Sequence, residues 1–271
     1  MVNYGIVANL VEIIIKVQND KVLNEAFITM ETLFDQGNIH AQSELARCLG
    51  YKEERGGDDD DDSSMEDSDD DEDFSNEFQV SIMASIEKES TSLKKLCTAR
   101  RESQLANWFG QKKDQKEGTE PEDDHEQQHL DQIKQHCQSL CQYFSVLQLF
   151  CEGHFKPLQN LLREQNTETN AQQVNFYHTG VILYGSLIQF LNENTKDLIL
   201  QVLDFLIEAV QGPNKQNQEF LFKSKFFEFF KDYIVDYSDN EEIFRNEEKS
   251  NLIEEIIRFS IAFFAACQLH L

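Results

Sequence analysis

The sequence predicts an all-α protein, either a helical bundle or an armadillo-like helical solenoid, with a disordered acidic insertion. Two observations predict the helices. The chain of 271 residues contains only 3 Pro and 11 Gly, which disfavours a fold rich in turns, and apolar residues recur at intervals of three and four along most of it. A third observation predicts the insertion, because residues 58–73 hold 12 acidic side chains among 16 positions and no basic one.

Residues 1–50 are expected to form an N-terminal segment of two or three helices. A stripe of apolar side chains at helical spacing predicts the first helix over 6–17. Asn19 is suited to cap the start of the second, and Gly37 follows its last apolar residues as a stop signal. A third, short helix is expected over 39–49.

The middle of the chain is expected to alternate between linkers and one helix. Residues 51–75 show no apolar period, and the mutual repulsion of their charges predicts a disordered acidic linker. Residues 76–109 regain an amphipathic pattern, with the helix expected over 76–98. A second polar linker is expected over 110–126, where Gly and Pro recur.

Residues 127–271 give the clearest globular pattern. Helices are expected over 127–153, 155–164, 171–192, 196–211, 217–236 and 241–268. Thr195 is a suitable N-cap for the fourth of these, and Gly212 with Pro213 ends it, because Gly suits a left-handed cap and Pro cannot continue a helix. Successive helices with short links are typical of an armadillo-type solenoid, but the sequence contains no repeat that would exclude a bundle.

Composition excludes several classes of function. The formal net charge of −26 disfavours nucleic acid as a partner, since phosphate backbones repel so acidic a protein. About half of that charge lies in residues 58–73. Six Cys without framework spacing indicate free, mostly buried thiols in a reducing compartment. The most apolar stretch, 259–269, is about half as long as a membrane-spanning helix, so we interpret it as a core helix and expect no direct membrane span.

Two patterns resemble metal or catalytic motifs. His125 and His129 fit the H-E-x-x-H spacing of zinc hydrolases, but the pair borders a polar linker and no further ligand follows at the expected distance. Cys137 and Cys141 lie one helical turn apart, and two thiols alone do not complete a tetrahedral zinc site. We therefore expect no zinc and no enzymatic activity, with a zinc hydrolase as the remaining enzyme alternative.

The acidic insertion has two further interpretations. It lacks the residue order of an EF-hand, so weak and unselective cation binding is the most it predicts beyond a solvated spacer. Ser63, Ser64 and Ser68 each precede an acidic residue by three positions, a pattern typical of acidophilic kinase sites. Phosphorylation there would extend an already repulsive segment.

Two segments carry a more specific pattern. The first is Leu147–Asn166 (LQLFCEGHFKPLQNLLREQN), and the second, about 55 residues later, is Leu203–Gln218 (LDFLIEAVQGPNKQNQ). Together they resemble the RIH-associated domain of inositol trisphosphate receptors and ryanodine receptors, whose patterns read close to LQLLCENHNRDLQNYLR and LTEYCQGPCxxNQ. The resemblance covers about residues 130–240, and residues 19–42 resemble the helical region before that domain in the trisphosphate receptors.

The resemblance implies a calcium-dependent role. Members of the family are tetrameric calcium-release channels of the endoplasmic reticulum, and their armadillo-like domains couple ligand binding on the cytoplasmic side to the pore. By resemblance, Glu152 and Glu208 would supply carboxylates to the activating calcium site, with His154 and Gln211 in support. The family's final calcium contact comes from a segment after the pore, so the site in these residues is expected to be incomplete.

The chemistry of these residues agrees with such a site. Calcium prefers oxygen ligands, and Glu208 and Gln211 lie three positions apart and hence on one helix face. Composition alone would favour the alternative that Glu152 and Glu208 are ordinary surface carboxylates. One departure from the family pattern is Pro157, which is expected to change the start of the next helix.

Two functions from different classes follow from these observations. The first is a regulatory and coupling module of an intracellular calcium-release channel, with channel subunits or a pore segment outside these residues as partners, in a homo-tetramer for the full-length form. It would lie on the cytoplasmic side of the endoplasmic reticulum membrane. The alternative is a free-standing, cytoplasmic, armadillo-like scaffold that uses apolar helix surfaces to hold partner proteins.

Overall fold

The computed structural model describes residues 5–17, 19–51, 75–110, 122–165 and 173–238, together with Glu254, Ile257, Arg258, Ile261 and Ala265. Across these residues all regular structure is helical, which confirms the predicted all-α fold class. The acidic insertion over 58–73, and with it the three candidate phosphorylation sites, lies outside the described residues. So does the predicted helix over 241–268, apart from the five single residues.

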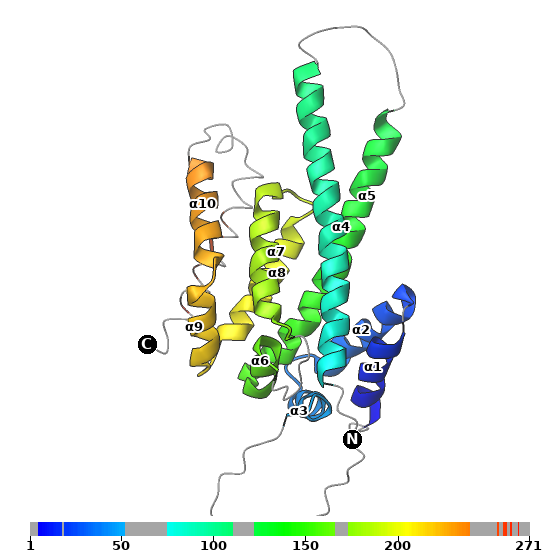
Figure 1. Ribbon diagram of the computed structural model, residues 1–271, viewed down its shortest axis with the longest axis vertical. Helices are drawn as coiled ribbons and strands as arrows, with labels where there is room; N and C mark the ends of the chain where they lie inside the picture. Colours follow the sequence, from blue (N-terminus) through cyan, green and yellow to red (C-terminus); the bar gives the residue numbers. More distant parts are fainter. Residues whose placement is uncertain are drawn as a thin grey trace, which may run out of the picture.

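The helices form a bundle around one long antiparallel pair. The α-helices are α1 (Gly5–Lys16), α2 (Asp20–Phe34), α3 (Ile39–Cys48), α4 (Ser75–Gly110), α5 (Glu122–Cys151), α6 (Lys156–Arg163), α7 (Phe176–Leu187), α8 (Lys196–Val210), α9 (Lys215–Lys223) and α10 (Phe226–Ser238), with 3-10 turns at Glu152–His154 and Ile188–Phe190. Helices α4 and α5 run side by side, and their joined ends project beyond the other helices (Figure 1). The N-terminal helices α1–α3 pack on one side of this pair, and α6–α10 continue from the other.

Aromatic contacts attach both groups of helices to α5. Phe34 of α2 meets Phe150 of α5 edge to face, with ring centroids 4.9 Å apart. Phe144, two turns earlier on α5, packs against Phe205 of α8 at 5.5 Å. These rings belong to a single apolar cluster with members in every helix from α1 to α10. Helix α5 therefore lies between the N-terminal helices and the rest of the bundle and packs against both.

Several helix boundaries differ from the prediction. Helix α4 continues to Gly110 rather than ending near 98, and α5 begins at Glu122 within the predicted linker. At the base of the two extensions, Arg100 of α4 and Glu126 of α5 form an ion pair at 3.6 Å. An amphipathic period does not reveal such polar ends, because they bury little apolar surface.

The predicted single helix over 217–236 is two helices. Helix α9 ends at Lys223 and α10 begins at Phe226. At the break, the Ser224 hydroxyl donates to the Leu221 carbonyl oxygen at 2.7 Å and accepts from the Phe226 amide at 3.2 Å. A serine that satisfies backbone groups on both sides of a corner can end one helix and start the next. Among the described helices, none has both the length and the apolar composition needed to cross a membrane.

Candidate functional site

The first candidate carboxylate, Glu152, lies on the tight turn between α5 and α6. Gly153 reverses the chain with φ of 69°, and His154 also adopts a positive φ of 63°. Pro157 sits in the first turn of α6, where its missing N–H leaves no intrahelical bond unmade. The departure from the family pattern at Pro157 is thus compatible with a helix that begins at Lys156.

A buried amide from α3 fastens this turn. The side-chain Nε2 of Gln42 donates to the carbonyl oxygens of Leu149 at 3.0 Å and Glu152 at 2.9 Å, with a longer contact to Phe150 at 3.4 Å. Gln42 is only 1% exposed. The last carbonyl groups of a helix have no intrahelical partner. The Gln42 side chain, which comes from α3, therefore caps the C-terminal end of α5.

The second candidate carboxylate, Glu208, lies in the last turn of α8. Gln211 caps the helix, and its Nε2 donates to Oε1 of Glu208 at 3.0 Å. The buried side chain of Gln159, from α6, donates to the carbonyl oxygens of Glu208 at 2.9 Å and Gln211 at 3.2 Å. Gly212 then turns the chain with φ of 78°. A glutamine therefore closes each of the two helix ends that carry a candidate carboxylate.

The two turns lie against each other. A Cβ placed on Gly212 would come within 2.8 Å of the His154 Cβ and 2.9 Å of its Cγ, so only glycine fits at that position without a shift. The charge of Glu152 is one of the lesser causes that raise the pKa of Glu208, so the two carboxylates lie within electrostatic reach of each other. The two residues that the sequence motifs single out are thus brought together.

Burial and like charges shift the electrostatics of this site. Burial is the main cause that raises the pKa of Glu208 to about 7, and Glu152 and Asp204 raise it further, while the Gln211 hydrogen bond lowers it. Burial also raises the pKa of Asp204, one turn earlier on the same helix, to about 6. An uncompensated group of carboxylates is the environment in which a cation gains most from binding.

A polar network centred on the buried side chains of Asn217 and Tyr177 supports the Glu208 turn. Asn217 donates to the Ala209 carbonyl oxygen at 2.9 Å and the Tyr177 hydroxyl at 3.3 Å, and its own oxygen accepts from Arg163. The Tyr177 hydroxyl donates to the Gln159 carbonyl oxygen at 2.6 Å. The residues after the Gly-Pro pair in the second motif therefore hold the loop to α6 and α7 rather than face a ligand.

Comparison with known proteins identifies the region that holds both turns. Residues 134–234 match the protein family described as RyR and IP3R Homology associated, the RIH-associated domain. This match to the RIH-associated domain covers 101 of the 271 residues of the chain. Over an alignment 80 residues long, the chain is 41% identical to the inositol 1,4,5-trisphosphate receptor itr-1 of Caenorhabditis elegans, and the alignment covers 27% of the chain and 3% of that receptor. The chain thus spans a small fraction of the length of this curated relative.

The candidate residues on the two turns offer the type of ligand atom that calcium prefers, but fewer of them than calcium usually binds. Two carboxylates and the Gln211 amide offer hard oxygen donors, which calcium prefers over nitrogen and sulfur. Within the described ranges, no three His, Cys, Asp or Glu side chains are grouped to hold a metal ion. Calcium takes six to eight oxygen ligands, so Glu152, Glu208 and Gln211 are too few to hold the ion by themselves.

The remaining predicted sites lie apart from these turns. His129 is exposed on α5, and the side chain of His125 lies outside the described residues. Cys137 and Cys141 are free thiols, and burial raises the pKa of each to about 12, which keeps them protonated at neutral pH. Protonated thiols are poor nucleophiles and metal ligands, in agreement with a structural role.

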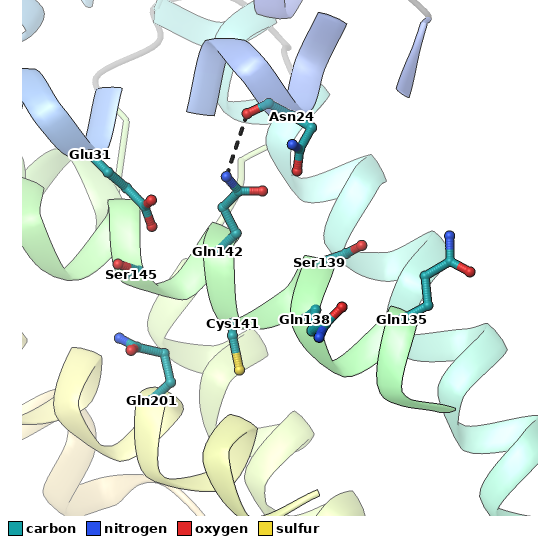
Figure 2. A pocket seen from close by; sticks show the side chains of 9 residues that line it. All are labelled: Asn24, Glu31, Gln135, Gln138, Ser139, Cys141, Gln142, Ser145 and Gln201. Atoms are coloured by element: carbon teal, nitrogen blue, oxygen red, sulfur yellow. Dashed lines mark hydrogen bonds between the residues drawn. The ribbon is translucent and has the colours of Figure 1, made fainter. Parts of the chain in front are cut away.

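A polar cavity of about 520 Å³ opens between α2, α5 and α8, separate from the two turns. Figure 2 shows the amides of Gln135, Gln138 and Gln142 along α5, with Gln201 facing them from α8. The Gln142 amide donates to the Asn24 carbonyl oxygen at 3.4 Å. The cavity contains neither candidate carboxylate, so it lies apart from Glu152 and Glu208.

Sequence reasoning missed three residues of the site. Asp204 precedes Glu208 by four positions, a spacing that could have placed it on the same face. Gln42 and Gln159 gave no signal, because their role depends on hydrogen bonds to backbone oxygens 107–110 and 49–52 residues away.

Proposed function

We propose that this chain is a regulatory, non-enzymatic module of an intracellular calcium-release channel, and that it senses calcium through Glu152 and Glu208. The observation that carries the proposal is the pairing of these carboxylates on two adjoining turns. Burial, with a smaller contribution from the charge of Glu152, raises the pKa of Glu208 to about 7. A divalent cation would displace the proton from Glu208 and remove the repulsion between the two carboxylates.

In this proposal the two turns act as a clamp. Glu152 lies at the end of α5 and Glu208 in the last turn of α8, so one bound cation would draw the two helix ends together. Gln211 would orient the Glu208 carboxylate through its hydrogen bond. His154 would pack against Gly212, beside the bound ion. The missing ligands would come from a segment outside this chain, through which helix movement would reach a pore.

The context of the proposal comes from the family. The RIH-associated domain and the trisphosphate receptor relative support a place on the cytoplasmic side of the endoplasmic reticulum membrane, with channel subunits as partners. A tetramer of the full-length form follows the same resemblance. The alternative, an armadillo-like scaffold without calcium sensing, predicts no calcium response at the two turns.

Calorimetric titration with calcium at pH 7.5 tests the proposal. The full chain is expected to bind calcium, and Glu152→Gln or Glu208→Gln is expected to weaken binding at least tenfold, because each removes one charged ligand. Glu164→Gln, an exposed carboxylate close in sequence, is the matched control and should leave binding unchanged. Binding that survives both site variants but disappears when residues 58–73 are deleted would reject the sensor and assign the ion to the acidic insertion.

A further inference from the structure

The Glu152 turn depends on a residue that lies outside the RIH-associated domain. Gln42 belongs to α3, whereas the family match begins at residue 134. Its amide reaches the carbonyl oxygens of Leu149 and Glu152, 107 and 110 positions along the chain. The N-terminal helices are thus attached by hydrogen bonds to the backbone of a candidate ligand.

A second contact from the same helices touches the same residue. Gly37, in the turn between α2 and α3, has φ of 63°, and a Cβ there would lie 3.2 Å from both the carbonyl carbon and the oxygen of Glu152. A side chain on residue 37 would therefore push directly on the backbone that carries the Glu152 carboxylate. The hydrogen bonds of Gln42 hold the Glu152 turn close to α3. The close contact at Gly37 limits how near the Glu152 turn can come to the turn between α2 and α3.

Apart from the packing of His154 on Gly212, the described contacts at the Glu152 backbone come from Gln42 and Gly37. Gly153 and His154 are exposed, and the turn has no side-chain cap of its own. Both residues occupy the left-handed region, which is unfavourable for His154 and persists only where surrounding contacts impose it. Among the described polar contacts, the hydrogen bonds that Gln42 donates to the carbonyl oxygens of Leu149 and Glu152 can hold the turn in this conformation.

We propose that Gln42 is a positioning residue for Glu152, so that the α1–α3 unit sets the calcium affinity of a site in the RIH-associated domain. The inference rests on the proposed calcium function. Residues that orient a metal ligand without touching the metal commonly change metal affinity tenfold or more. A shift of α3 relative to α5 would move the Glu152 backbone and thereby change the distance between the two carboxylates.

Gln42→Met tests the proposal, because methionine fills the same space and donates no hydrogen bond. In the calcium-free full chain, amide hydrogen exchange at residues 153–155 is expected to accelerate about tenfold, and in the calorimetric titration the calcium Kd is expected to rise about tenfold. The matched control is Gln165→Met, which removes a glutamine that is 2% exposed and makes three hydrogen bonds to Leu161 and Val174, away from the two turns. The control should lower stability without changing the Kd.

Gly37→Ala is the second variant, should Gln42→Met fail to fold. It keeps every buried hydrogen bond and presses on Glu152, so the Kd should again rise. Gly50→Ala is its control, because Gly50 has a similar φ of 72° and is exposed at the far end of α3. Unchanged exchange and an unchanged Kd in Gln42→Met or Gly37→Ala would overturn the inference. Failure of the unmodified chain to bind calcium would instead overturn the proposed function.

Discussion

The two turns that carry Glu152 and Glu208 are built in opposite ways. The Glu208 turn is fixed by its own neighbourhood, since Gln159, Asn217 and Tyr177 form a buried network around it. The Glu152 turn is exposed and is held mainly from a distance, through Gln42. A site made of one rigid and one adjustable half can respond to movement elsewhere, because only one half has to shift.

The largest test of this comparison removes the apolar attachment of the N-terminal helices. Phe34 is fully buried and meets Phe150, two residues before Glu152. Phe34→Ala is expected to lower the free energy of unfolding by about 4 kcal/mol, since it leaves a cavity at the α2–α5 interface. Urea denaturation measures it, with Ile28→Ala, a partly exposed position on the same helix, as the control. A loss no larger than that of the control would show that α2 is not part of the cooperative fold.

The next test removes the buried hydrogen bonds that hold the Glu208 turn. Asn217→Leu leaves the Ala209 carbonyl oxygen, the Arg163 guanidinium and the Tyr177 hydroxyl without this partner. We expect a loss of about 3 kcal/mol in the free energy of unfolding, because unsatisfied buried polar groups are costly. Gln189→Leu, at an exposed amide, should change stability little. Equal effects of the two substitutions in urea denaturation would contradict the role given to the network.

The pH dependence of stability tests the charge on the rigid half. The folded pKa of Glu208 is raised to about 7 from an ordinary value of 4.5, so ionisation of Glu208 destabilises the fold and stability falls as pH rises between these values. Glu208→Gln should therefore stabilise the protein at pH 8 by about 1–2 kcal/mol, and have little effect at pH 4.5. Thermal unfolding across this range measures the difference.

Glu219→Gln is the control, because the pKa of Glu219 is shifted in the opposite direction to that of Glu208. Its hydrogen bond to Lys223 lowers the pKa of exposed Glu219, so the ionised carboxylate stabilises the fold above pH 4.5 and loses that effect as the pH falls. The control should therefore show no gain in stability at pH 8. A stability gain from Glu208→Gln that does not vary with pH would contradict the repulsion between Glu208 and its acidic neighbours.

The smallest expected effect concerns the backbone of the adjustable half. His154 has φ of 63°, where glycine is more favourable. His154→Gly is expected to change the free energy of unfolding by less than about 0.5 kcal/mol, because relief of strain offsets the entropy of the added glycine. His178→Gly, at an exposed histidine with helical backbone in α7, should cost about 1 kcal/mol. A similar loss at both positions would mean that the turn stores no strain at His154.

The same comparison explains how far the sequence alone could reach. The places of Glu152 and Glu208 near the ends of α5 and α8 were predictable, because both lie inside motifs whose order and spacing are specific. Residue spacing also predicted most helices, since apolar stripes record the buried face. The support of the Glu152 turn was not predictable, since Gln42 acts through a contact 110 positions away. Nor was the full length of α4, because its polar end carries no apolar stripe.

The attachment of α1–α3 to α5 also has a consequence for synthesis on the ribosome. Phe27, Met30 and Phe34 of α2 are buried against a bundle in which α5 is the main contact, and the acceptors of Gln42 lie 107–110 residues later in the chain. At 5–20 residues per second, about 5–20 s separate the emergence of Gln42 from that of its partners. During that interval the aromatic face of α2 has no α5 to cover it. A nascent chain of this protein is therefore expected to need shielding by a chaperone early in translation, well before the RIH-associated domain has been made.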